Sequence, residues 1–157
     1  MTAQTFTVTS NDTLTLNGHV FNDLAYDDVT TVTFPNQLMS RKTGKNGNTI
    51  IAKNANGLNA DVRIRLMRGS ADDQYMQQLI SQQPNDFPSL QLLGGTFVKR
   101  LGDGQGNVES DTYLLAGGTI SKIPDGKENV SGDTEQGVAV YDMIFASGNR
   151  TLGEWLN

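Results

Sequence analysis

The chain has 157 residues, a formal net charge of −5 and no cysteine, and its mean hydropathy is −0.39. This length predicts one domain over residues 1–157 with a substantial core. The acidic balance excludes the basic surface of a nucleic-acid-binding protein, and the absence of cysteine excludes disulfides, thiol catalysis and cysteine-based zinc sites. Neither a signal peptide nor an apolar run of membrane-spanning length is recognisable, which predicts a soluble protein made in the cytoplasm.

Alternating threonines and apolar residues predict strands in the first part of the chain. Thr5–Thr9 and Thr13–Leu16 are separated by Asn11-Asp12, which is turn chemistry, so they predict a hairpin that ends at Asn17-Gly18. Asp28–Phe34 is rich in threonine and valine and predicts a third strand, which Pro35 ends.

The segment Asn36–Asn56 is long and polar, and it holds four of the twelve basic residues. Such a segment is either an irregular surface insertion or a structured arm. The arm would run out through Leu38–Thr43, turn at Lys45–Asn48 and return through Thr49–Lys53. The pair Ile50-Ile51 favours the arm, because two adjacent isoleucines are too apolar for a segment that stays solvated.

The period of the apolar residues changes from two to a helical spacing at Ser70. Val62, Ile64 and Leu66 alternate with charged residues and predict a strand with one buried face. A helix is predicted over Ser70–Gln83, ended by Pro84, with an apolar stripe of Tyr75, Met76, Leu79 and Ile80. Ser70 is the expected N-cap, with Asp73 as an aspartate variant of the capping box, and first-turn capping accounts for both Asp72 and Asp73.

Two glycine-interrupted strands are predicted after the helix. Ser89–Leu101 contains Gly94-Gly95, and Asp111–Ile123 contains Gly117-Gly118, so the two glycine pairs can meet at a bulge or a close backbone approach. Gly102–Asn107 between the strands predicts a hairpin turn.

The C-terminal region begins with a polar loop and continues with the most apolar strand of the chain. Gly137–Ala146 predicts a strand buried on both faces, and Leu152, Trp155 and Leu156 predict that the tail Arg150–Asn157 packs a short turn onto the domain. The complete pattern predicts a mainly β fold: an antiparallel β-sandwich or partly open barrel with one flanking α-helix and a long extended hairpin arm.

The sequence predicts no catalytic, cofactor-binding or metal site, and therefore no enzyme. His19 is the only histidine, and a structural role explains it. The glycines of Gly102–Gly106 lack the following helix that a phosphate loop needs. Asp103, Asn107, Glu109 and Asp111 miss the spacing of a calcium loop.

Three features resemble the tail tube proteins of contractile-tailed bacteriophages. These are the strand–helix segment Asp61–Gln83, the glycine-interrupted strands Gln91–Leu101 and Thr112–Ile123, and the apolar strand Gly137–Ala146, which in chain order extend over residues 61–146, more than half of the chain. The resemblance implies a structural virion protein that forms hexameric rings, which stack into the hollow inner tail tube through which phage DNA passes. It also implies that the partners are other copies of the chain and the sheath, baseplate and tape-measure proteins, with DNA not specifically bound.

The segment Asn36–Asn56 is similar in position to the extended hairpin that bridges neighbouring rings in that family. The residues expected in the ring-stacking arm are Arg41, Lys42, Lys45, Ile50, Ile51 and Lys53. The residues expected in an acidic partner surface on the next ring are Asp125, Glu128, Asp133 and Glu135.

Two alternatives remain open at this point. The first is an inner-tube protein of a contractile bacteriocin or of a machine like type VI secretion. The second, of another class, is a carbohydrate-binding or receptor-binding β-module. Such modules display clustered aromatic residues, whereas the four tyrosines and one tryptophan of this chain are spread singly.

Overall fold

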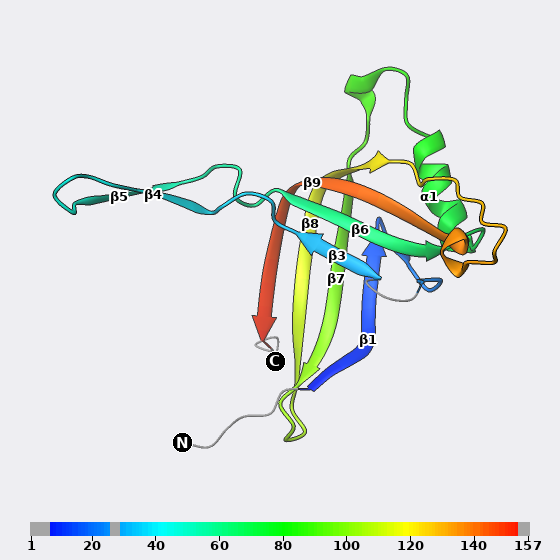
Figure 1. The fold of residues 1–157 in the computed structure, drawn as a ribbon, viewed down its shortest axis with the longest axis horizontal. Coiled ribbons are helices and arrows are strands. Elements are labelled where there is room, and N and C mark those ends of the chain that lie inside the picture. The colour runs from blue at the N-terminus through cyan, green and yellow to red at the C-terminus, as the bar shows by residue number, and fades with distance from the viewer. Residues whose placement is uncertain (1–6, 26–28, 154–157) are drawn as a thin grey trace.

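A computed structural model describes residues 7–25 and 29–153 and has the mainly β fold that the sequence predicts (Figure 1). One antiparallel sheet has seven strands in the order β2-β1-β7-β8-β9-β6-β3, and β4 and β5 form a separate hairpin. The elements are β1 (Thr7–Leu16), β2 (His19–Val20), β3 (Thr30–Thr33), β4 (Met39–Thr43), β5 (Thr49–Lys53), β6 (Ala60–Met67), α1 (Ala71–Ser81), β7 (Leu93–Gly102), β8 (Val108–Lys122) and β9 (Val138–Gly153). Two short 3₁₀ turns cover Phe87–Ser89 and Thr134–Gly137.

The long strand β9 joins two parts of the sheet that run in different directions. Its first half pairs with β6, from Val138 opposite Met67 to Phe145 opposite Ala60. Its second half pairs with β8 as far as Gly153 opposite Ser110. Figure 1 shows β9 bending sharply between these halves, so that β6 and β3 cross over β7 and β8. The coiled sheet encloses the core in this way, and α1 lies at one end of it.

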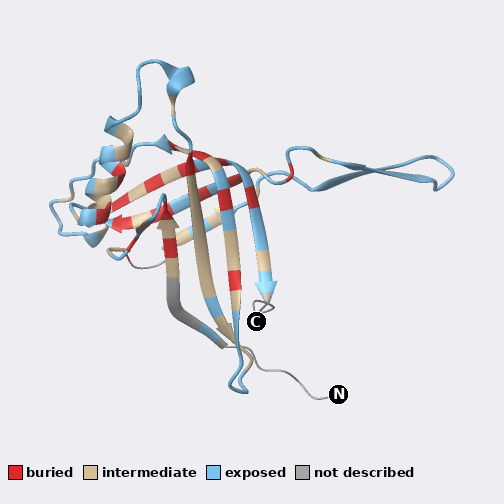
Figure 2. Ribbon diagram, turned by 180° about the vertical axis from the view of Figure 1, so that it is seen from behind, coloured by how far each residue is buried: buried red, intermediate tan, exposed pale blue. Residues whose placement is uncertain are grey.

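The core is formed by the inner faces of the strands. Figure 2 shows buried residues alternating along them. On β6, Val62, Ile64 and Leu66 are each at most 1% exposed, while the charged residues between them lie outside. Tyr141 from β9 and Met76 from α1 are both fully buried. The apolar face of β6 and the apolar stripe of α1 therefore pack into the same core, as the sequence predicts.

The expectation that the last strand is buried on both faces is wrong. Met143 and Phe145 are 2% and 3% exposed, whereas Ile144 between them is 48% exposed. The strand also continues to Gly153, where a separate terminal turn was expected, and Leu152 is half exposed. Trp155 and Leu156 lie outside the described residues.

The prediction of an N-terminal hairpin that turns at Asn11-Asp12 is also wrong. Thr7–Leu16 is one strand, β1, which pairs with β7 and has an irregular register between Val8 and Asp12. The reversal occurs at Asn17-Gly18 instead, where both residues have positive φ (49° and 83°), as the two-residue turn between β1 and β2 requires. A long strand partner stabilises β1 more than an isolated short hairpin would.

The two glycine pairs meet at a bulge, as expected. Leu93 pairs with Gly118 and Gly95 with Leu115, so β8 carries one extra residue at this point. Gly117 has a φ of +68°, and a Cβ atom on Gly95 would lie 2.9 Å from the Thr15 carbonyl oxygen. These positions therefore need glycine for both backbone conformation and close approach.

Candidate assembly interface

The hairpin β4–β5 projects from the body of the molecule as an extended arm (Figure 1). Its two strands pair antiparallel from Met39 opposite Lys53 to Thr43 opposite Thr49. Every residue of both strands is exposed (Figure 2). The structure therefore confirms an ordered two-stranded arm in place of an irregular insertion.

Backbone hydrogen bonds hold the base and the tip of the arm. At the base, the Asn54 amide donates to the Leu38 carbonyl at 2.9 Å, and Gly57 packs so closely that an added Cβ would lie 2.8 Å from Leu38 Cα. At the tip, the Gly44 amide donates to the Asn48 carbonyl at 2.8 Å, and Gly47 has a φ of +88°. These contacts fix where the arm leaves the body and where it turns.

The arm is basic, and its charges are not matched within the chain. Arg41, Lys42, Lys45 and Lys53 all lie on it, together with no acidic residue. In the part of the chain that the structure describes, none of these four side chains makes an ion pair. Their charge is therefore accessible to another molecule.

The segment 125–135, which holds the four residues of the expected acidic surface, lies at the end of the molecule opposite the arm (Figure 1). They are not equally accessible. Glu135 accepts two hydrogen bonds from Arg65, at 2.7 and 2.8 Å, and Asp125 lies 3.6 Å from Lys122 Nζ. Asp133 caps the 3₁₀ turn by accepting a bond from the Glu135 amide, while Glu128 is exposed. Glu135 thus has a role within its own subunit that the sequence did not indicate.

The N-terminus of α1 begins as predicted, with one change in detail. The Ser70 hydroxyl oxygen accepts a hydrogen bond from the Asp73 amide at 3.3 Å, so Ser70 is the N-cap. The Asp73 carboxylate accepts a reciprocal bond from the Gly69 amide, one residue before the cap, and another from the Tyr141 hydroxyl. Burial and the bond to this carboxylate raise the pKa of Tyr141 well above its usual range.

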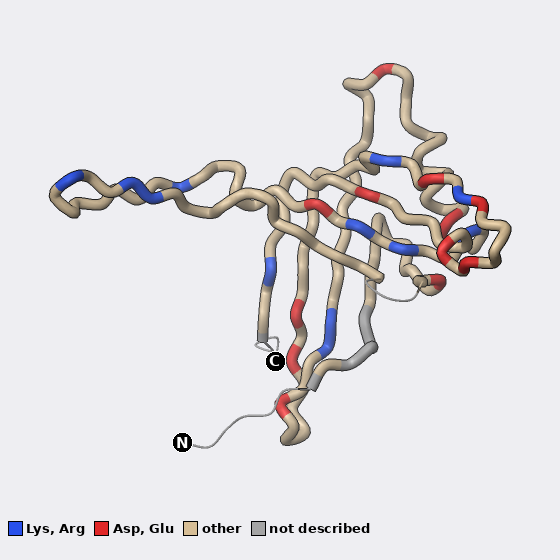
Figure 3. The backbone as a smooth tube through the Cα atoms, viewed as in Figure 1, with Lys and Arg blue, Asp and Glu red and all other residues tan. Residues whose placement is uncertain are grey.

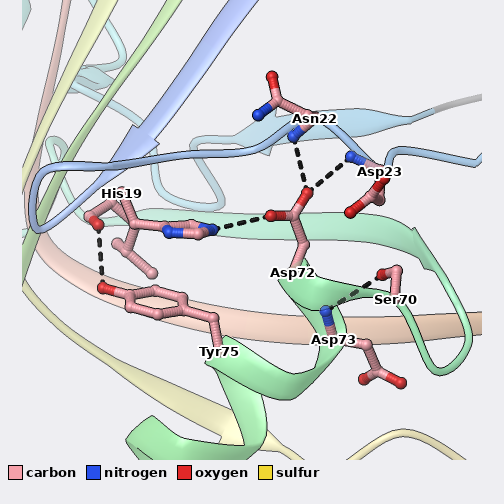
Figure 4. A network of polar contacts seen from close by, with 8 residues as sticks. His19, Asn22, Asp23, Ser70, Asp72, Asp73 and Tyr75 are labelled. Atoms are coloured by element: carbon pink, nitrogen blue, oxygen red, sulfur yellow. Dashed lines mark hydrogen bonds and ion pairs between the residues drawn. The ribbon is translucent and has the colours of Figure 1, made fainter.

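Asp72 has a role that capping does not explain, and the expectation that it only caps the helix is wrong. Its carboxylate is 2% exposed and accepts bonds from the backbone amides of Asn22 and Asp23, both at 2.7 Å (Figure 4). His19 Nε2 lies 2.8 Å from its other oxygen. Burial alone would raise the pKa of Asp72, but these hydrogen bonds and the His19 ring outweigh it and lower the pKa.

His19 is a structural residue, as the sequence predicts. Its ring stacks on Tyr75 of α1 with a centroid distance of 4.0 Å, and the Tyr75 hydroxyl donates to the Leu16 carbonyl at 3.2 Å. Together, His19, Asp72 and Tyr75 attach the helix to the segment that follows β1. Sequence spacing could not show this contact, because the partners are about fifty residues apart.

Ion pairs hold charges on the sheet. Arg63 Nε lies 2.8 Å from Asp142, its direct partner on β9, and Arg65 of β6 bonds to Glu135 of the 3₁₀ turn Thr134–Gly137. Arg150 makes two bonds of 2.9 Å to Asp111 across β8 and β9. The outward alternation of Arg63 and Arg65 was visible in the sequence, but the identity of their partners depends on strand register.

A groove of about 640 Å³ lies over β3, β6 and β9, and its charged residues include Arg63, Arg65 and Asp142. These side chains bind one another or Glu135 and do not form a convergent set. Within residues 7–25 and 29–153, no cluster of three or more metal-ligating side chains occurs, and no helix is long and apolar enough to cross a membrane.

The outer strand β3 leaves one edge of the seven-stranded sheet open. Among residues 7–25 and 29–153, it pairs with β6 on one side only, and its four residues, TTVT, include neither lysine nor proline. Lysine and proline are common means of protecting an exposed edge from pairing. This edge can therefore accept a strand from another molecule.

The structure is similar to proteins of contractile injection systems, although no family model and no curated protein matches the sequence. It matches the tube-terminating cap of the anti-feeding prophage with a TM-score of 0.66 and 8% identity, over 96% of this chain and 94% of the other. It matches a chain of the PVC sheath–tube complex, from an extracellular contractile injection system, with a TM-score of 0.56 and 8% identity (90% and 86% covered). The PVC sheath/tube terminator matches with a TM-score of 0.58 and 7% identity (92% and 94% covered). The chain therefore shares its fold with tube-terminating and sheath–tube components.

Proposed function

We propose that this protein is a structural subunit of the tail of a contractile injection system, located in its inner tube or at the end of that tube. The observation that carries the proposal is the fold similarity to the cap of the anti-feeding prophage, which spans almost the whole of both chains. The similar proteins belong to injection particles, which favours the injection-system alternative over the DNA-conducting phage tube that the resemblance implied. Hexameric rings, with residues 1–157 acting as one domain, form part of the same proposal.

The arm supports a role in stacking such rings. It extends from one end of the molecule and is basic, while the residues 125–135 at the other end hold Asp125, Glu128 and Asp133 (Figure 3). In a head-to-tail assembly, the arm of one subunit reaches the acidic end of the next. Charge complementarity of this kind guides association and fixes its register more than it adds affinity.

The open edge at β3 supports lateral contacts within a ring. Its backbone amides and carbonyls on the side away from β6 are available to a neighbour's strand. Joining the sheets of neighbouring subunits in a closed ring would leave no edge exposed. The sheath and other tail components are the further partners that the sheath–tube similarity suggests.

A terminator subunit is a second candidate, because the TM-score to the cap exceeds that to the sheath–tube chain (0.66 and 0.56). A carbohydrate-binding module has less support. Such a module needs clustered aromatic rings on an accessible surface. Phe87 is 78% exposed but takes part in no ring contact among the described residues, and the stacked pairs Phe97–Tyr113 and His19–Tyr75 are only partly exposed.

Electron microscopy of the purified protein at increasing concentration tests the proposal. Long tubes indicate a tube subunit, and single rings that do not grow indicate a terminator. A protein that stays monomeric at every concentration and in the presence of preformed tubes would contradict both.

The role of the arm is tested by deleting Thr43–Asn48, or by replacing Lys42 and Lys45 with glutamate. We expect both variants to keep the wild-type circular dichroism spectrum and melting temperature, because the affected residues are exposed and outside the core. Tube growth should be slowed or lost. A matched control places the same number of glutamates at Gln91 and Gln105, which are exposed on the body outside the segment 125–135. Normal polymerisation of the arm variants would show that the arm is only a surface hairpin.

A further inference from the structure

The two isoleucines of the arm lie on opposite faces of it. In an antiparallel pair, directly opposed residues share a face, and successive residues alternate between faces. Ile51 is opposite Arg41, and it shares the first face with Met39 and Lys53. Ile50 is opposite Lys42, and it shares the second face with Ser40 and Ala52. The sequence indicated that the pair Ile50-Ile51 is too apolar to stay solvated, and the register shows that the two side chains point in opposite directions.

Both faces of the arm therefore remain open to a partner. Ile50 is 71% exposed and Ile51 is 68% exposed, and each strand of the arm has five residues, all exposed. A two-stranded ribbon of this size is marginally stable without support. One flat surface can cover only one of the two faces, so it leaves the other isoleucine in water.

We propose that the arm is clamped between two copies of this chain in the neighbouring ring. The proposal rests on the ring-stacking role proposed above and extends it, because it assigns each face of the arm to a separate copy of the chain. Each copy covers one face, and each buries one of the two isoleucines.

The first face fits the acidic end of a second copy. Ile51 has Arg41 directly opposite on β4 and Lys53 two residues along β5 on the same face, so two positive charges flank an apolar centre. In the segment 125–135, Val130 is fully exposed and lies between Glu128 and Asp133. Ile51 with its basic neighbours and Val130 with its acidic neighbours are therefore complementary. Contacts of this type favour one relative position of the two subunits over others.

The second face fits a less charged surface on the subunit beside that copy. Lys42 is its one charged residue, and Ile50, Ser40 and Ala52 complete it. In a ring of identical subunits, an arm that reaches the acidic end of one subunit has a neighbour of that subunit on its other side. Because the first face is more basic than the second, we place the first face against the acidic end of one copy and the second face against the neighbouring copy.

The test replaces Ile50 and Ile51 with threonine, singly and together, because threonine keeps the β-branched shape and removes most of the apolar contact. The readout is the protein concentration at which half of the chains sediment as assemblies. We expect each single variant to raise this concentration at least tenfold and the double variant to raise it at least a hundredfold. The control Val108→Thr removes an apolar group that is 59% exposed at the start of β8, and it should change the concentration less than twofold.

The outcomes separate the clamp from the stacking role. If only one isoleucine matters, the arm lies on a single surface and the clamp is wrong, while ring stacking stands. If neither single variant nor the double variant changes assembly, the stacking role is wrong as well. An equal effect of Val108→Thr would show that any lost apolar group weakens assembly, which also overturns the clamp.

Disulfide trapping gives an independent measurement, because the chain has no native cysteine. Ile51→Cys combined with Val130→Cys should cross-link assembled subunits under mild oxidation. Ile50→Cys combined with Val130→Cys should not. Equal cross-linking of both pairs would contradict the assignment of the first face to the acidic segment.

Discussion

The Asp72 contacts predict a specific order of stabilities among substitutions at this position. Asp72→Ala leaves the amides of Asn22 and Asp23 without their acceptor, next to a side chain that is 2% exposed. An unpaired buried donor costs about 1–3 kcal/mol; these two bonds are partly buried, so the lower half of that range applies and the two amides together predict a loss of about 3 kcal/mol. For a domain of this size, that loss lowers the melting temperature by about 6–12 °C.

Asp72→Asn is the matched control because it keeps the size of the side chain. Its carbonyl oxygen can still accept from the two backbone amides, and its NH₂ group can donate to His19 Nε2 if that nitrogen is unprotonated. The remaining cost is the loss of the charge from these bonds, about 1.5 kcal/mol. Urea unfolding of dilute protein, followed by circular dichroism, measures both variants. Equal losses within 0.5 kcal/mol, or a loss below about 1 kcal/mol for alanine, would refute the role of the two amides.

The same contacts predict a dependence on acid. The pKa of Asp72 is lower in the folded chain than in the unfolded chain, so the unfolded chain binds this proton more readily. The contribution of Asp72 is therefore complete above the unfolded pKa of about 4 and is lost as the pH falls through the lower folded value. The stability difference between wild type and Asp72→Asn should shrink below about pH 4. A difference that does not shrink in acid would contradict the lowered pKa.

Two further substitutions test the fold. Ser70→Ala should lower the free energy of unfolding by about 1 kcal/mol through loss of the N-cap, while Ser81→Ala at the exposed end of α1 should not change it. Equal melting temperatures of the two variants would contradict the assigned helix start. Gly118→Ala should cost about 1–3 kcal/mol, because its Cβ would lie 2.2 Å from the ring of Phe145, which is 3% exposed. The control Gly126→Ala meets no atom within 4 Å and should not lower the melting temperature.

The sequence was sufficient to predict those elements that depend on residues close to one another along the chain. The alternation in β6, the stripe of α1 and the Ser70 cap each depend on residues within a few positions of one another. The arm belongs with them, because its turn at Gly44–Asn48 and its two strands are contiguous. Its register then determines which residues share a face, a detail that composition alone does not give.

The incorrect predictions concern residues whose partners are distant in the sequence. Asn11-Asp12 has turn chemistry, but β7 provides a strand partner more than eighty residues away. Ser147-Gly148-Asn149 suggests the end of a strand, yet β9 continues because Gly148 lets the backbone approach Ala60 and Phe34, where a Cβ would lie 2.9 and 3.0 Å from their side chains. Tertiary contacts overrode local preference at both places.

The charges of the molecule are divided between a body that pairs many of them internally and an arm whose charges are unpaired within the described chain. Arg63, Arg65 and Arg150 bind carboxylates of their own subunit, whereas the four basic residues of the arm do not. The arm contributes +4 to a chain of net charge −5, so the remaining residues carry −9. Bodies with this charge repel one another, and a basic arm placed between two of them reduces that repulsion. Salt screens both effects, and contacts of the proposed kind, which exclude water, would be screened less than the exposed charges of the bodies. In the proposed assembly the arm acts as both a contact and a counter-charge, which accounts for the lack of ion pairs to its cations among the described residues.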